Sequence, residues 1–256
     1  MRLSYSDIEK IAIAELYRFM SPAIDAKGVR AIVIGTFASS YLQMQIKYTR
    51  LSDCGKVLGI TTYADADIIL RRNYRNETIY VPAKTILLDE CLSPPDIWGK
   101  PDNASKQRQF TIAHECAHQI LYRRMPEDER RKFDMKYSKR IMTIQEMKTV
   151  EDWREWQANA LAAALIMPKK YIELLLGNRR LFLFGNRMNI PDNIVFRNIG
   201  NRLGVSQTAL KLRLKQLGYL HVLTASDYFN PMDIECDEDF YSAEQKMGVQ
   251  ANGKCS

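Results

Sequence analysis

The chain has 256 residues, of which 46% are hydrophobic, and its formal net charge is +7. That length can bury one sizeable core with a small second domain beside it. The N-terminus lacks the apolar core of a secretory signal, and the longest apolar run, 160–167, is too short to cross a bilayer. Five scattered cysteines without a CxxC pair indicate reduced thiols in a cytoplasmic protein.

The first part of the chain is expected to hold one helix followed by several short strands. A capping-box pattern at Ser6 begins a helix that should end near Met20, before Pro22. Runs of β-favouring residues, with turn residues between several of them, predict strands at 30–34, 45–48, 57–62, 68–70, 78–81 and 85–88. The order in which these strands pair cannot be predicted from their sequences.

A loop at 93–103 leads into a helix expected from Ser105 to Arg124, and this helix contains the HExxH motif at 114–118. Its two histidines are one turn apart, so both imidazoles face the same side and can bind one metal ion. Zinc binds neutral imidazole and lowers the pKa of its bound water to about 7. Glu115 can act on that water without being a ligand. The alternative is a helix that carries two histidines by chance, packed or exposed.

A hydrolytic zinc site needs a third protein ligand, and the next strong helix, 150–166, supplies the better candidate. Glu155 lies 37 residues after His118, and the small residues that follow it allow the two helices to approach each other. Asn159 is one turn further along the same face, where it can orient Glu155 or a metal-bound water. His221 is the weaker competitor, because it lies beyond a basic segment near the C-terminal tail.

Two other residues in or near the motif can be explained either by packing or by a role in the chemistry. Tyr122 continues the four-residue spacing of the histidines and is a candidate transition-state donor, although a packed tyrosine is favoured. Cys116 is two residues from each histidine and should face away from the metal, as a packed residue in preference to a redox thiol. The mixed-charge stretch 123–140 is expected to be a solvated helix, and Pro168 to open a short helix through Leu175.

Three blocks of sequence follow one another between Arg108 and Pro168. They read RQFTIAHECAH at 108–118, EWQAN at 155–159 and LIMP at 165–168. Together they resemble the patterns RxFTxAHExxH, ExxAN and a final MP of the ImmA/IrrE family of zinc metallopeptidases. Residues 58–63 show a weaker resemblance to the N-terminal sheet of that family. Cys116-Ala117 departs from the pattern, since Leu-Gly is commoner there.

The resemblance implies an α+β fold with a gluzincin-like metallopeptidase domain, in which a small sheet accompanies the HExxH helix and a ligand helix. It implies a Zn2+ cofactor held by His114, His118 and Glu155, with Glu115 as the general base. It also implies a cytoplasmic endopeptidase, and many members cut a transcriptional repressor of a mobile element or stress regulon. The strand at 85–88 is a candidate edge for pairing with an extended substrate.

The segment 177–221 is strongly basic and has the pattern of a helix-turn-helix. Its eight Arg or Lys stand against one acid, Asp192, while Gly204 supplies the turn and Ser206 caps the second helix. Three residues would lie at the exposed start of that helix, where DNA-binding versions read bases: Gln207, Thr208 and Lys211. A helical subdomain that packs on the peptidase or docks the repressor is favoured over DNA binding.

These features predict a metallopeptidase domain over 1–176, a helix-turn-helix-like subdomain over 177–223 and an acidic tail over 224–256. A bolder hypothesis is that the tail masks the basic segment. The competing function is a DNA-binding regulator or sensor with a non-hydrolytic zinc site. A fourth protein ligand would favour that reading, because structural zinc sites are closed, whereas Glu115 favours the peptidase.

Overall fold

The computed structural model describes residues 2–20, 30–52, 56–72, 75–95, 102, 104–136, 141–143, 152–185 and 187–223. The acidic tail, and with it the masking hypothesis, lies outside the described residues. Within the described part of the chain, no helix has the length and apolar character needed to cross a membrane.

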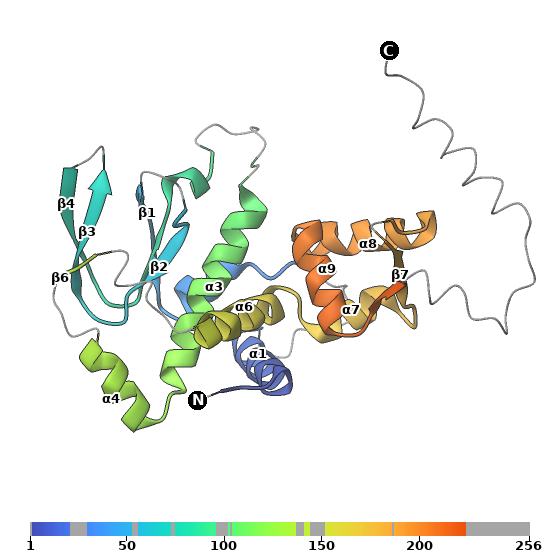
Figure 1. Cartoon of the computed structure of the whole chain (residues 1–256), viewed down its shortest axis with the longest axis horizontal. Coiled ribbons are helices and arrows are strands. Elements are labelled where there is room, and N and C mark those ends of the chain that lie inside the picture. The colour runs from blue at the N-terminus through green and yellow to red at the C-terminus, as the bar shows by residue number, and fades with distance from the viewer. Residues whose placement is uncertain are drawn as a thin grey trace, which may run out of the picture.

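The larger part of the molecule contains two small sheets beside a set of helices (Figure 1). The first sheet has the order β1-β5-β2, with β1 parallel and β2 antiparallel to β5. Its strands are Gln45–Tyr48 (β1), Gly59–Thr61 (β2) and Thr85–Leu88 (β5). The second sheet has the order β4-β3-β6, with β4 antiparallel and β6 parallel to β3. Its strands are Ala66–Arg72 (β3), Arg75–Val81 (β4) and Ile141–Thr143 (β6).

Helix α3 (Ser105–Arg123) lies between the first sheet and helix α6 (Asp152–Ile166), and α1 (Tyr5–Met20) packs on α6 in turn. The side chains that allow the close approach of α3 and α6 are small and fully buried alanines: Ala113, Ala117, Ala158 and Ala162. Small residues at this contact bring the HExxH motif and the start of α6 within side-chain reach of each other.

Strand β5 separates two clusters of buried apolar side chains. Ile86 and Leu88 face the helices, whereas Leu87 packs with Ile68 and Leu70 of β3. Because successive side chains of a strand point to opposite faces, one buried strand contributes to both clusters. Since β5 pairs on both sides, the expectation that 85–88 is an edge strand is wrong. The edge that packs against α3 is β2.

Most expected elements are confirmed within a few residues, but the strand expected at 30–34 is wrong. Residues 30–33 have no regular structure, and a short helix α2 (Ile34–Thr36) continues into a π-helical turn η1 (Phe37–Tyr41). The buried side chains recur at helical intervals, at Ile34, Phe37, Ala38 and Leu42. The apolar run at 30–34 is too short to show whether its apolar residues repeat at a helical or a strand period, so the helix could not be recognised from the sequence. The solvated helix expected within 123–140 is α4 (Glu127–Lys136). A 3-10 turn, η2 (Glu90–Leu92), follows β5.

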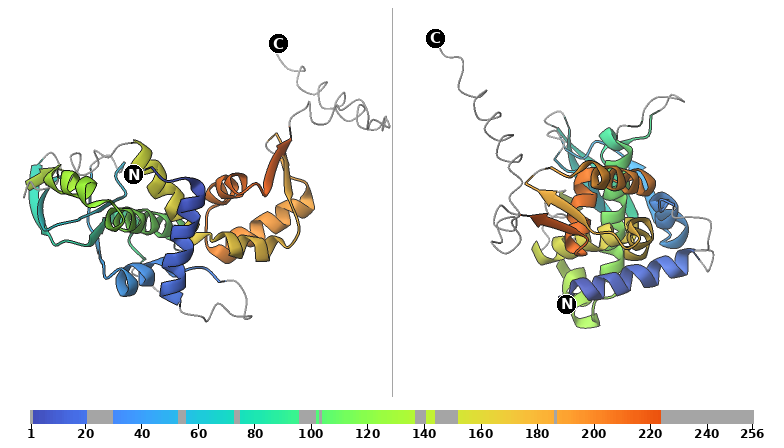
Figure 2. Two further views of the ribbon diagram at one scale, coloured as in Figure 1. Left: turned by 90° about the horizontal axis from the view of Figure 1, so that it is seen from below. Right: turned by 90° about the vertical axis from the view of Figure 1, so that its right-hand side faces the viewer.

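The C-terminal lobe lies at the opposite end of the molecule from the β4-β3-β6 sheet (Figure 1, Figure 2). Its elements are α7 (Lys169–Leu176), β7 (Leu181–Phe184), α8 (Ile190–Leu203), α9 (Gln207–Gln216) and β8 (Leu220–Leu223), with β7 and β8 parallel. Gly204 has a left-handed φ of 67°, and the Ser206 hydroxyl accepts a hydrogen bond from the Ala209 amide at 3.2 Å. The buried side chains of the lobe join those of α1, α3 and α6 in one cluster. The boundary placed after residue 176 stays a prediction.

Candidate metal centre

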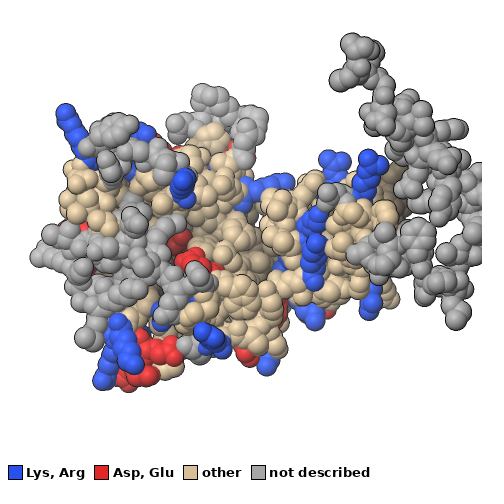
Figure 3. Space-filling view, in the orientation of Figure 1, with Lys and Arg blue, Asp and Glu red and all other residues tan. Residues whose placement is uncertain are grey.

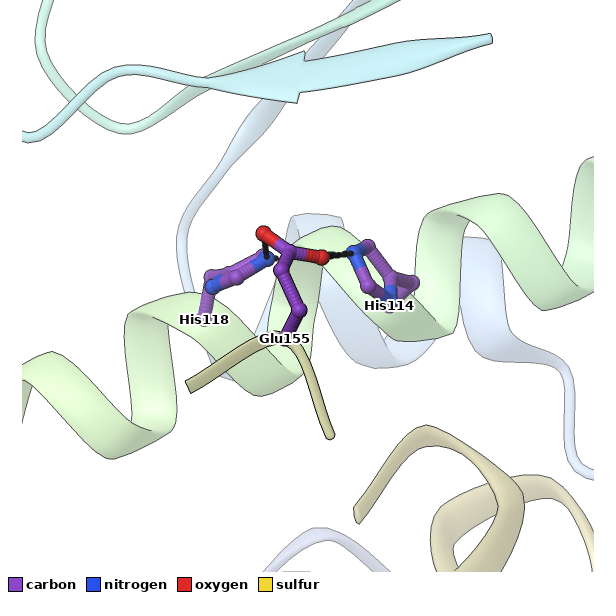
Figure 4. Close-up of side chains that lie close together, drawn as sticks. All are labelled: His114, His118 and Glu155. Atoms are coloured by element: carbon purple, nitrogen blue, oxygen red, sulfur yellow. Dashed lines mark hydrogen bonds and ion pairs between the residues drawn. The ribbon is translucent and has the colours of Figure 1, made fainter. Parts of the chain in front are cut away.

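His114, His118 and Glu155 meet at the contact between α3 and α6 (Figure 4). Glu155 Oε2 lies 3.3 Å from His114 Nε2, Glu155 Oε1 lies 3.4 Å from His118 Nε2, and the two Nε2 atoms are 3.0 Å apart. Within the described residues, this is the one group of His, Cys, Asp and Glu side chains close enough to hold a metal ion. Two imidazole nitrogens and one carboxylate fit a zinc-type ion and leave a fourth tetrahedral position open.

Asn159 sets the orientation of the first histidine. It lies one turn after Glu155 on α6, and its Oδ1 is 3.0 Å from His114 Nδ1. An amide oxygen only accepts hydrogen bonds, so His114 Nδ1 donates this one. When His114 is neutral, its Nε2 is then the nitrogen that is available to bind a metal ion. The residue expected to orient Glu155 or a water therefore acts on His114 in this structure.

The charges in the centre attract one another. Hydrogen bonds with His114 and His118 hold the pKa of Glu155 well below its usual value, against the opposing effect of burial. Burial acts to lower the pKa of His114, but the hydrogen bond with Glu155 and the charges of Glu115 and Glu155 raise it overall. A metal ion would compete with these protons when it binds, so binding should release protons.

Glu115 is buried beneath strand β2, and its side chain is only 4% exposed. At Gly59 of β2, a Cβ atom would lie 2.6 Å from Thr111 Cγ2 and 3.0 Å from Glu115 Oε1. Only glycine fits here without displacement, because contacts below 3.0 Å force a neighbour to move. Glu115 could be identified from the HExxH motif, whereas Gly59 could not, because its importance depends on a contact between distant segments.

Two more side chains of α3 fix the helix to its surroundings. Arg108 donates to the carbonyl of Leu92 at 2.9 Å and forms an ion pair with Asp102, which anchors the start of the helix. Gln119 is buried and donates to the carbonyl of Thr62 at 2.9 Å, just after β2. Arg108 belongs to the first sequence block, whereas no sequence pattern indicated Gln119.

Tyr122 is directed away from the three ligand candidates. Its hydroxyl donates to Asp134 of α4 at 2.7 Å, and its ring lies 4.8 Å from Tyr63 and 5.5 Å from Phe133, between centroids. Burial and the bond to Asp134 raise the pKa of Tyr122 to about 12. These contacts fit the packed reading, and a transition-state role stays a prediction.

The remaining sequence candidates lie outside the centre. His221 is on β8, where it stacks on Phe182 with 5.6 Å between ring centroids. Cys116 is fully buried in the core, as the packed reading expected. The polar residues at the start of α9 are on the surface, with Gln207 and Thr208 exposed and Lys211 half-buried. On the face drawn in Figure 3, Lys and Arg side chains lie over this lobe.

Comparisons with known proteins identify the family of the same part of the chain. The model of the M78 peptidase family, described as an IrrE N-terminal-like domain, matches residues 58–215. No curated protein matches the chain. The matched range begins just before β2, includes both helices of the centre and continues into α9. The chain therefore belongs to the M78 family of metallopeptidases, with an IrrE N-terminal-like domain.

Proposed function

We propose that this protein is a zinc-dependent, gluzincin-like endopeptidase of the cytoplasm that cleaves a DNA-binding transcriptional repressor of a mobile element or stress response. One observation carries the proposal: two imidazole nitrogens and one carboxylate converge beside a buried glutamate. A structural zinc site would add a fourth protein ligand, and none joins the group among the described residues. Membership of a peptidase family supports the same conclusion.

The chain's own residues divide the chemistry between them. A zinc ion held by His114, His118 and Glu155 would polarise the scissile carbonyl and lower the pKa of a water to about 7. Glu115 accepts the proton of the attacking water and later donates it to the leaving amine. Asn159 keeps His114 in the tautomer that presents Nε2 to the ion.

The repressor as substrate is supported by the resemblance to the ImmA/IrrE family and by the basic lobe beside the centre. Members of that family commonly act on regulators of transcription. A cleaved repressor would release its operator, which couples one proteolytic event to gene expression.

Binding of DNA is a second candidate, and the charge of the C-terminal lobe favours it. Gln207 and Lys211 are at the start of α9, on a lobe rich in Lys and Arg. Contacts to phosphates make DNA affinity fall steeply with salt. A regulator would therefore bind duplex DNA in a mobility-shift assay with a strong salt dependence and would cut no protein.

The test uses zinc-loaded wild type and Glu115→Gln with each repressor encoded beside the gene. Both proteins should bind zinc, while only the wild type should cut, because loss of the general base costs about 100-fold or more in rate. Equal cutting by the two proteins would show that Glu115 is not the general base. If the wild type cuts no repressor, the proposed substrate is wrong.

A further inference from the structure

A groove of about 930 Å³ opens beside the metal centre, between the larger part of the molecule and the C-terminal lobe. One wall is the first half of α3, the second is α6, and the third is α9 of the lobe. The apolar side chains that line these walls include Phe110 of α3, Trp156 and Ala163 of α6, and Leu212 of α9. This volume is near the upper end of the range of pockets that enclose ligands, so it can hold more than one side chain.

The groove continues into the metal centre. Asn159, whose side chain contacts His114, also lines the groove, and so does Thr111. Phe110 lies one turn before His114 on α3, which is a separation of about 6 Å along the helix. An extended peptide advances about 3.3–3.6 Å per residue. A chain cleaved at the centre would thus place in the groove a side chain about two residues from the scissile bond.

The chemistry of the groove is mainly apolar. Trp156 and Leu212 are 40% and 65% exposed, although large apolar side chains are usually buried. Among the described residues that line the groove none is acidic, and the basic ones are the exposed Lys106 and the buried Arg213. Gln216 also lines the groove, and its buried amide nitrogen has no hydrogen-bond partner within the described part of the chain.

We propose that the groove binds the segment of the protein substrate next to the scissile bond, and that it selects bulky apolar side chains there. This inference rests on the proposed peptidase function. Leu212 of α9 is then a specificity-determining residue, which the C-terminal lobe contributes to the groove. Thr208, expected at a base-reading position, lines the same groove and so faces the bound peptide.

The test uses the full-length, zinc-loaded protein and short internally quenched peptides that differ only at positions flanking the central bond. These positions carry Leu, Ala, Asp or Lys. The wild type should prefer the Leu peptide over the Ala peptide by about tenfold in kcat/KM. Leu212→Glu should remove most of that preference and improve cleavage of the Lys peptide, a gain that simple damage to the fold would not produce.

Ile194→Glu is the matched control, because Ile194 is an apolar residue of the same lobe, 56% exposed, that does not line the groove. It should keep the wild-type order of preference. If Leu212→Glu also keeps that order while the peptides are cleaved, the groove does not select side chains and the inference is overturned. The peptidase function would stand in that case.

A separate measurement covers the case in which the wild type cleaves none of the peptides. That result counts against the proposed function, so binding to Glu115→Gln is then measured by fluorescence anisotropy. The Leu peptide should bind about tenfold more tightly to Glu115→Gln than to Glu115→Gln/Leu212→Glu. Equal binding, or none to either protein, would overturn the inference independently of cleavage.

Discussion

Single side chains decide how the metal centre is prepared, and Asn159 is the clearest example. Its Oδ1 accepts a hydrogen bond from His114 Nδ1, so a neutral His114 has its unprotonated nitrogen at Nε2, where the metal would bind. Replacing it with Ala should weaken zinc affinity by about 10- to 100-fold, because partners of this kind orient the ligand. Asn159→Asp keeps an acceptor and should bind more tightly than the Ala variant. Competition with a chromophoric chelator measures this, and unchanged affinity in Asn159→Ala would contradict it.

The two cysteine thiols within the described residues should differ in reactivity because their surroundings differ. Cys116 is fully buried, so iodoacetamide should label it only after unfolding. Cys91 is exposed, but a hydrogen bond with Asp89 together with burial raises its pKa to about 11. Its labelling should be slow at neutral pH and accelerate as pH rises toward that value, because the thiolate is the nucleophile. Peptide mass spectrometry follows both sites, and native labelling of Cys116 as fast as in urea would contradict this account.

At the scale of elements, the approach of β2 to α3 determines where Glu115 lies. Gly59→Ala should destabilise the fold by about 1–3 kcal/mol, since the new Cβ meets Thr111 Cγ2 and Glu115 Oε1. Adding Thr111→Ser removes Cγ2 while keeping the hydroxyl, so the double variant should recover part of the loss. Urea unfolding gives the free energies. A Gly59→Ala protein as stable as the wild type would show that the strand can shift freely.

How much the sequence predicts also differs between elements. The period of apolar residues and the spacing of His114, His118 and Glu155 were enough to predict α3, α6 and the ligand candidates. The central position of β5 could not be predicted, because strand order depends on pairing between distant segments. The close contact at Gly59 has the same origin, and so does the groove, since both appear only when separate elements pack.

In the assembly of the molecule, Arg213 of α9 connects the C-terminal lobe to helix α1. Its side chain is fully buried, its Nη2 donates to Glu9 Oε2 at 3.0 Å, and its Nε donates to the Met167 carbonyl at 3.2 Å. These bonds join α1, the end of α6 and α9, and so hold the third wall of the groove. The N-terminal helix therefore supports the position of the C-terminal lobe.

Removing one partner of the Glu9–Arg213 ion pair should lower the free energy of unfolding more than removing both partners. Glu9→Ala leaves a buried guanidinium without its carboxylate, which should cost about 3 kcal/mol in the free energy of unfolding. The double variant Glu9→Leu/Arg213→Met removes the buried charge and should be less destabilised. Urea titration of the wild type and the two variants tests this. Equal stability of Glu9→Ala and the wild type would mean that the pair does not hold the lobe.

We propose that His114, His118 and Glu155 form one metal site, and the zinc content of single variants tests this assignment. Wild type, His114→Ala, His118→Ala and Glu155→Ala are stripped with chelator, reloaded with zinc and measured by plasma mass spectrometry after desalting. The wild type should retain one zinc ion per chain, and each variant should retain far less. Equal zinc content in the wild type and the variants, or none in the wild type, would contradict the account.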